Sequence, residues 1–260
     1  LRLVGVAGWF WVVVQALSRA LASDAAIALF RDSDASTLLL WVYGWVGVAL
    51  ISAFIAPVWA WLDPFSSLYD LGAWLVGRIR PGLTMAAPDD YPARLGKWPA
   101  VAGFVFFVWL EFGVQDLIPP AIALVGYTVI TLTGMMLYGR DTWRDNAETF
   151  TVWFGMLGRL ATWQLEGPAR QAMRRRGFAS GLGDPWTTSE IALVGIATFA
   201  VLYDAVSQTT PWYSVLGVTG SVLVTLSFPL WVPLIAVLAL RLARTVGMVT
   251  LGAALVPVAV

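Results

Sequence analysis

The chain has 260 residues, of which 59% are hydrophobic and only 12% are charged, and its mean hydropathy is +0.76. Roughly a quarter of the residues in ordinary globular domains are charged. A water-soluble globular protein of this length could not bury so much apolar surface, so the composition excludes that class. The net charge is zero, which excludes a general attraction to nucleic acid. The chain has no Cys and no His, which excludes disulfides, thiolate or imidazole metal sites and the usual nucleophilic triads. We therefore expect no cofactor, no nucleic-acid partner and no enzymatic activity.

Long apolar runs predict an all-α, polytopic membrane protein, because a helix needs about 20 apolar residues to cross roughly 30 Å of hydrocarbon. The run Trp98–Tyr138 is long enough for two spans, and Pro119-Pro120 marks the turn between them. Pro229 and Pro233 fall inside the sixth span, where they either kink the helix or break it to free carbonyl oxygens for an ion. The sequence predicts six complete spans and the start of a seventh: Leu3–Leu21, Leu38–Leu62, two within Trp98–Tyr138, Ile191–Val206, Trp212–Leu240 and, incomplete, Val246–Val260.

Two amphipathic helices are predicted to lie in the membrane interface. The first follows Asp63-Pro64, an N-cap acid with proline at the first helical position. Its apolar residues recur every three or four positions as far as Ile79. The second is predicted over Asp145–Trp163, where Asp145 caps the helix and Glu148 completes a capping-box-like pattern. A basic loop follows the second helix.

The two interfacial helices share a skeleton that predicts a parallel tandem repeat. Trp61-x-Asp63 precedes one helix and Trp143-x-Asp145 the other, and an Arg-bearing loop and a two-span hairpin follow each. Two unrelated hairpins under the same interfacial constraints would give the same pattern. The predicted units are an N-terminal two-span hairpin, two repeat units that each hold an interfacial helix and two spans, and the start of a further span: 1–62, 63–138, 139–240 and 241–260.

The placement of basic residues predicts the orientation. With the N-terminus in the cytoplasm, every one of the 16 basic residues except Arg19 and Arg31 falls on the cytoplasmic side, as the positive-inside rule requires. We expect a multi-pass protein of a prokaryotic cytoplasmic membrane. Because the chain begins at Leu1 and stops within an apolar run, we expect both ends to be trimmed and predict nothing about a signal peptide.

Carboxylates within predicted spans are the first candidates for function, because such groups are costly unless they are paired or wet. Glu111, Asp116 and Asp204, with Gln115 beside the first two, predict a proton or cation site. Capping of short outer turns at the headgroup level is the alternative for Asp116 and Asp204, and a structural hydrogen bond is the alternative for Glu111. Thr128 and Thr131 predict a polar path along the fourth span, although small-residue stripes also serve close helix packing.

The basic loop contains four candidate contacts for anionic lipid headgroups or for a partner: Arg170, Arg174, Arg175 and Arg176. A plain topological anchor explains these arginines as well. Two functions stay open for the whole chain. The first is a small transporter or channel-like protein for an ion or small solute, and the second is a non-catalytic subunit or scaffold of a larger membrane complex. The expected partners are membrane lipids, other membrane subunits or further copies of the chain.

Overall fold

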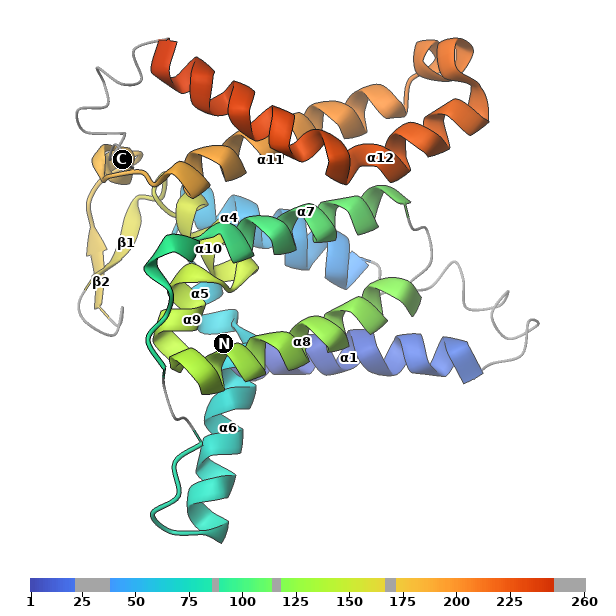
Figure 1. The fold of residues 1–260 in the computed structure, drawn as a ribbon. Helices are drawn as coiled ribbons and strands as arrows, with labels where there is room; N and C mark the ends of the chain where they lie inside the picture. Colours follow the sequence, from blue (N-terminus) through green and yellow to red (C-terminus); the bar gives the residue numbers. More distant parts are fainter. Residues whose placement is uncertain (22–37, 86–88, 114–117, 167–171, 246–260) are drawn as a thin grey trace.

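The computed structural model describes residues 1–21, 38–85, 89–113, 118–166 and 172–245, and these are mostly helical (Figure 1). Three described helices are long and apolar enough to cross a membrane, over Pro120–Tyr138, Thr188–Ser207 and Thr210–Ala243. Three shorter apolar helices accompany them, over Arg2–Ser18, Leu38–Phe54 and Trp98–Phe112. These lengths fit the predicted helical membrane protein, and the full number of spans stays a prediction. The predicted seventh span lies outside the described residues.

The long helices lie side by side and form the bundle in Figure 1. Phe104 and Val108 of one helix pack against Leu193 and Ile196 of a second and Phe228 of a third, and these residues form the main core. The N-terminus and the short polar elements gather at one end of the bundle. The helices that build it are α1 (Arg2–Leu21), the π-helix η2 (Leu38–Gly47), α4 (Val48–Phe54), α7 (Trp98–Gly113), α8 (Ile118–Tyr138), α11 (Thr188–Ser207) and α12 (Thr210–Thr245).

The second predicted span is shorter than the sequence suggests. The prediction of one helix over Leu38–Leu62 is wrong, because the helix ends at Phe54 and a short helix, α5 (Trp59–Leu62), follows the break. Pro57 lies in this break. Proline has no N–H to donate and restricts the residue before it, so it ends the helix. An apolar run alone does not reveal such a stop.

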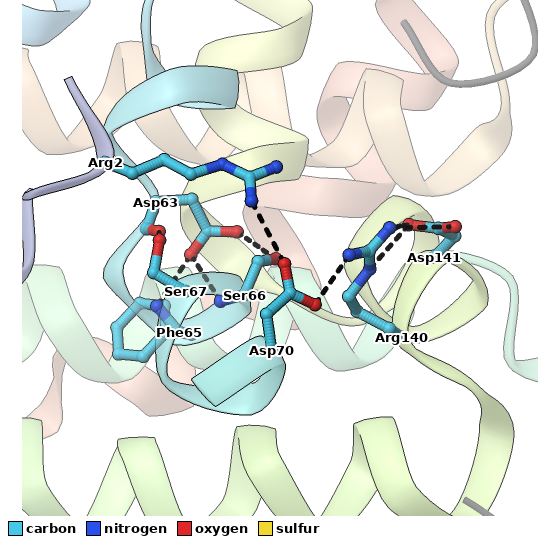
Figure 2. Close-up of polar contacts among 8 residues, drawn as sticks. All are labelled: Arg2, Asp63, Phe65, Ser66, Ser67, Asp70, Arg140 and Asp141. Atoms are coloured by element: carbon cyan, nitrogen blue, oxygen red, sulfur yellow. Dashed lines mark hydrogen bonds and ion pairs between the residues drawn. The ribbon is translucent and has the colours of Figure 1, made fainter. Parts of the chain in front are cut away.

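The first interfacial helix is confirmed as a helix, α6 (Pro64–Ile79), with Asp63 as its N-cap and proline at its first position. It extends away from the bundle (Figure 1) and exposes Trp74 and Ile79. Asp70 ties α6 to two other segments. Its carboxylate oxygens lie 3.1 Å from Arg2 of α1 and 2.7 Å from Arg140, as Figure 2 shows.

The prediction of a second interfacial helix over Asp145–Trp163 is wrong. The stretch forms two short helices, α9 (Arg140–Asn146) and α10 (Thr149–Leu157), and Asp145 lies in the last turn of α9 rather than at a cap. Glu148 is the N-cap of α10. α10 buries residues on several sides, including Thr149 and Phe154, because α4 and α7 both pack against it. A helix that is buried in this way belongs to the core.

The basic loop adds strands that an all-α fold does not have. β1 (Trp163–Glu166) pairs antiparallel with β2 (Ala172–Arg175), and Trp163 lies opposite Arg175. The hairpin lies at the same end of the bundle as α9 and the first turn of α11 (Figure 1). Because charged residues usually mark loops, the sequence offered little sign of these two short strands.

The last described helix bends at a glycine. α12 contains Pro229 and Pro233, yet its only non-helical backbone is at Gly217, with φ 65° and ψ 177°. Neighbouring helices and small backbone adjustments allow proline inside membrane helices. The two prolines are therefore tolerated within α12, and the alternative in which they break the helix is wrong. The helix also runs beyond the predicted end at Leu240, to Thr245.

We expect Gly195→Ala to destabilise the α11–α12 hairpin. A Cβ atom at Gly195 would lie 2.3 Å from the Cβ of Ala239, so the two helices would have to move apart. Overpacking of this kind costs about 1–3 kcal/mol. The melting temperature of the purified protein in detergent measures the effect. Gly126→Ala in α8 is the matched control, because a Cβ there meets nothing within 4 Å. An equal loss of stability in both variants would contradict the packing argument.

Candidate functional site: a polar pocket beside two buried carboxylates

Two acidic N-caps lie inside the protein, where the helices α6 and α10 begin. Asp63 accepts hydrogen bonds from the backbone N–H groups two and three residues later, at 2.9 and 3.2 Å (Figure 2). Glu148 repeats this arrangement at 3.0 and 2.7 Å. Each acid is followed after one residue by a phenylalanine, and the rings of Phe65 and Phe150 stack with centroids 6.3 Å apart. The first turns of α6 and α10 therefore contact each other through these two rings.

The carboxylate of Glu148 is enclosed by donors from three helices. Its side chain is fully buried, and Tyr127 of α8 donates a hydrogen bond to it at 2.6 Å. Trp59 of α5 donates to its other oxygen at 3.3 Å. The hydroxyl of Tyr127 in turn accepts from the backbone N–H of Thr149 at 2.8 Å. A buried carboxylate is tolerated only when it is bonded in this way.

Burial changes the proton affinity of both acids. It raises the pKa of Asp63 above the ordinary value of 3.8, against the opposing effect of hydrogen bonds and of Arg144. Burial also raises the pKa of Glu148 above 4.5, and the nearby charge of Asp63 raises it further. Both shifts favour the neutral, protonated form, because a charge is costly in a medium of low dielectric constant.

A polar pocket of about 260 Å³ lies beside the residues that surround Glu148. Trp59, the donor to Glu148, forms part of its wall, and so does Thr151, whose backbone N–H bonds the same carboxylate. The pocket therefore borders two of the residues that donate hydrogen bonds to Glu148. Its charged and polar walls include Lys97, Asp145, Thr151, Arg159, Asp184 and Glu190.

One buried carboxylate organises the charged wall of the pocket. Glu190 accepts from Lys97 at 2.6 Å and from Arg159 at 2.9 Å, both at the same oxygen. Its other oxygen accepts from the backbone N–H of Thr187 at 2.7 Å and completes the capping box of α11. Glu190 thus joins the residue before α7, the residues after α10 and the start of α11.

The structure brings together two of the acids predicted from the sequence. Glu111 lies in the last turn of α7 and Asp204 in the last turn of α11, close enough for their charges to interact. Both helices end away from the β-hairpin (Figure 1), so this pair lies far along the bundle from the pocket. Gln115 and Asp116 lie outside the described residues.

The predicted threonines lie within helix contacts. Thr128 is buried and accepts a hydrogen bond from Trp9 at 3.0 Å, which joins α8 to α1. Its hydroxyl also donates to the carbonyl of Leu124 at 2.7 Å. Thr131 is likewise buried. These contacts agree with the packing alternative, and the polar path stays a prediction.

The predicted arginine cluster is partly described. Arg174 and Arg175 belong to the exposed strand β2, and Arg170 lies outside the described residues. Arg176 donates to Gln164 at 3.2 Å and lies 3.6 Å from Asp184, a wall residue of the pocket. Arg176 is therefore connected to the candidate site.

Sequence reasoning missed the main residues of this site, although a signal was present. Asp63-x-Phe65-Ser66 and Glu148-x-Phe150-Thr151 share the pattern acid-x-Phe-Ser/Thr, which marks the two helix starts. The predicted internal repeat instead pairs Asp63 with Asp145. Lys97, Arg159 and Glu190 gave no sequence signal as a set, because they are brought together only by the tertiary fold.

No family model, curated protein or solved structure matches this chain. Among the described residues, no group of three or more acidic side chains is arranged to hold a metal ion. The chemistry of the site therefore has to be inferred from its own residues.

We expect the protein to be more stable at mildly acidic pH than at alkaline pH. The folded-state pKa of Glu148 lies above its ordinary value of 4.5. In the pH interval between the unfolded-state and folded-state pKa values, the folded state therefore binds more protons than the unfolded state. Stability then falls as the pH rises through this interval. Thermal unfolding in detergent between about pH 5 and about pH 8 measures it. Glu148→Gln keeps the shape of the protonated acid but cannot titrate, so it should flatten the dependence of melting temperature on pH. An unchanged slope in that variant would show that Glu148 does not cause the pH dependence.

Proposed function

We propose that this chain is a small membrane transport protein for an ion or a small solute, and that the polar pocket is the place where the solute binds. The observation that carries the proposal is the contact between a charged pocket and a buried carboxylate: Trp59 borders the pocket and bonds Glu148. Ionisable groups held within a membrane bundle commonly mark the pathways of ions and protons. Concave sites with a few convergent polar groups commonly bind small molecules.

The second acid pair supports the same proposal. Glu111 and Asp204 lie towards the end of the bundle away from the β-hairpin, and the pocket lies near the hairpin end. Together the two pairs place titratable groups along the length of α7. With the cytoplasmic N-terminus that the basic residues predict, the pocket would open to the cytoplasm. Movement of one predicted repeat unit against the other would then alternate the access to the acids.

A specific observation favours the second candidate, a subunit of a larger membrane complex. An apolar groove of about 610 Å³ runs between α11 and α12, and its walls include Val194, Leu202 and Leu234. α12 buries few of its apolar side chains, and Leu230 and Leu242 are both exposed. A helix of a partner subunit would fill this groove with as good a fit as lipid chains would give.

Flux through reconstituted vesicles tests the transport proposal. We expect proteoliposomes to move protons, sodium ions or inorganic phosphate faster than protein-free vesicles do. Glu148→Gln and Glu111→Gln should each reduce the flux at least about tenfold, as expected for groups that must titrate or bind an ion. A pH-sensitive dye inside the vesicles and radioactive sodium and phosphate outside them measure the three fluxes.

The control is Asp90→Asn, which neutralises an exposed carboxylate of the loop before α7, and it should leave the flux unchanged. Purification in mild detergent accompanies the assay. A stoichiometric partner protein, together with no flux of any probe through the isolated chain, would overturn the transport proposal and favour the subunit.

A further inference from the structure

Helix α6 packs against the bundle along one side of its first half. Phe65, Tyr69 and Ala73 recur every four residues, so they lie on one face of the helix. These three residues belong to an apolar cluster that also contains Met135 of α8. This face of α6 is therefore covered by the protein itself.

The opposite face of α6 is apolar as well, but it is exposed. Leu71 and Leu75 lie one turn apart, and each is about 200° around the helix from the residue two positions before it, Tyr69 or Ala73. The large side chains of this face are between 43% and 77% exposed. They are Leu71, Trp74, Leu75 and Ile79. An exposed apolar patch of this kind marks a site of interaction with a protein or a membrane.

Ion pairs place α6 at one end of the bundle. Asp70 bonds Arg2, at the start of α1, at 3.1 Å, and it bonds Arg140 at 2.7 Å. Arg140 comes two positions after Tyr138, where α8 ends, and α8 is long and apolar enough to cross a membrane. Asp70 therefore lies at the level where this candidate span ends. From there α6 runs across the direction of α1 and α8 rather than along it (Figure 1), so it would lie along the surface of a bilayer that α8 crosses.

The charges beside the exposed face are all positive. Between Leu71 and Met85 the only charged residues are Arg78 and Arg80, and both are exposed. Neither arginine has an ion-pair partner among the described residues. Two such cations beside an apolar face are complementary to a leaflet with anionic headgroups. Trp74 on the same face also favours a membrane, because tryptophan is enriched at the headgroup level.

We propose that the second half of α6 lies on an anionic phospholipid leaflet, with its exposed apolar face among the acyl chains and Arg78 and Arg80 at the phosphate groups. Guanidinium groups are the usual partners of phosphate oxygens. The sequence predicts an interfacial helix here, and the structure assigns the face that meets the lipid. The packed face and Asp70 fix the first half of α6 to the bundle, so the lipid contact falls on the second half. This surface is separate from the polar pocket, so the inference does not rest on transport.

Spin labels on single cysteines test where α6 lies when the full chain is held in nanodiscs. The chain has no Cys, so each variant carries one label. The label of Leu75→Cys should be reached by dissolved oxygen, which concentrates in hydrocarbon, and not by a water-soluble nickel reagent. Gly77→Cys is the matched control, because it lies two residues on, on the opposite side, and a side chain there meets nothing within 4 Å. Its label should be reached by the nickel reagent.

The lipid composition tests the role of the two arginines. We compare nanodiscs of phosphatidylcholine alone with nanodiscs that also contain phosphatidylglycerol, and we expect a larger lipid-embedded fraction of the Leu75→Cys label with the anionic lipid. In phosphatidylglycerol, Arg78→Gln and Arg80→Gln should each lower the ratio of embedded to water-exposed label about fivefold. Arg94→Gln is the control, because Arg94 is also exposed but lies outside α6, and it should leave the ratio unchanged.

The outcomes decide between a lipid surface and the other occupants of this face. Equal access of the nickel reagent to the labels at positions 75 and 77 would overturn the inference, because the apolar face would then lie in water. Equal embedding with and without phosphatidylglycerol would remove the arginines and the anionic leaflet from it. Protection of the label at position 75 only in nanodiscs that hold two copies would identify a second chain as the occupant instead of lipid. Embedding of α6 in a chain that moves no solute would keep this inference and remove the transport proposal alone.

Discussion

The structure depends on one constraint, that a carboxylate removed from water must be surrounded by donors. Glu148 meets it with two backbone N–H groups, a phenol and an indole, drawn from α10, α8 and α5. These bonds fix where α10 begins and how it faces α8. Asp63 does the same for α6. The turn from α5 into α6 and the turn from α9 into α10 therefore lie at positions where an acid caps the next helix.

The same constraint shows why the sequence predicts some elements and not others. The bundle helices follow from apolar runs, and α6 follows from Asp63-Pro64, because both signals are local. α10 has local signals too, but the sequence gives no sign that α4 and α7 would cover it. Its sequence therefore predicts an interfacial helix, because an amphipathic helix of that composition also fits the interface. The β-hairpin was missed because its pairing rests on two four-residue strands rich in polar side chains.

The candidate site divides in the same way. Glu111 and Asp204 were found because a charge inside an apolar run is visible in the sequence, and the fold brings them near each other. Lys97, Arg159 and Glu190 lie at the edges of apolar runs, where charges are ordinary. Only the fold shows that one carboxylate binds both cations. Edges of spans, which sequence reasoning treats as anchors, thus supply the best-formed polar site in the described part of this chain.

The bend at Gly217 has a consequence for the membrane itself. Its backbone conformation is one that only glycine adopts at little cost. From this residue to Arg241 the chain has roughly 23 apolar or small residues, a helix of about 35 Å, which slightly exceeds a hydrocarbon layer of about 30 Å. A modest tilt absorbs that difference. The position of one glycine therefore sets the apolar length of α12, a helix long and apolar enough to cross a membrane, and with it the bilayer thickness that such a span would match without distorting the lipid.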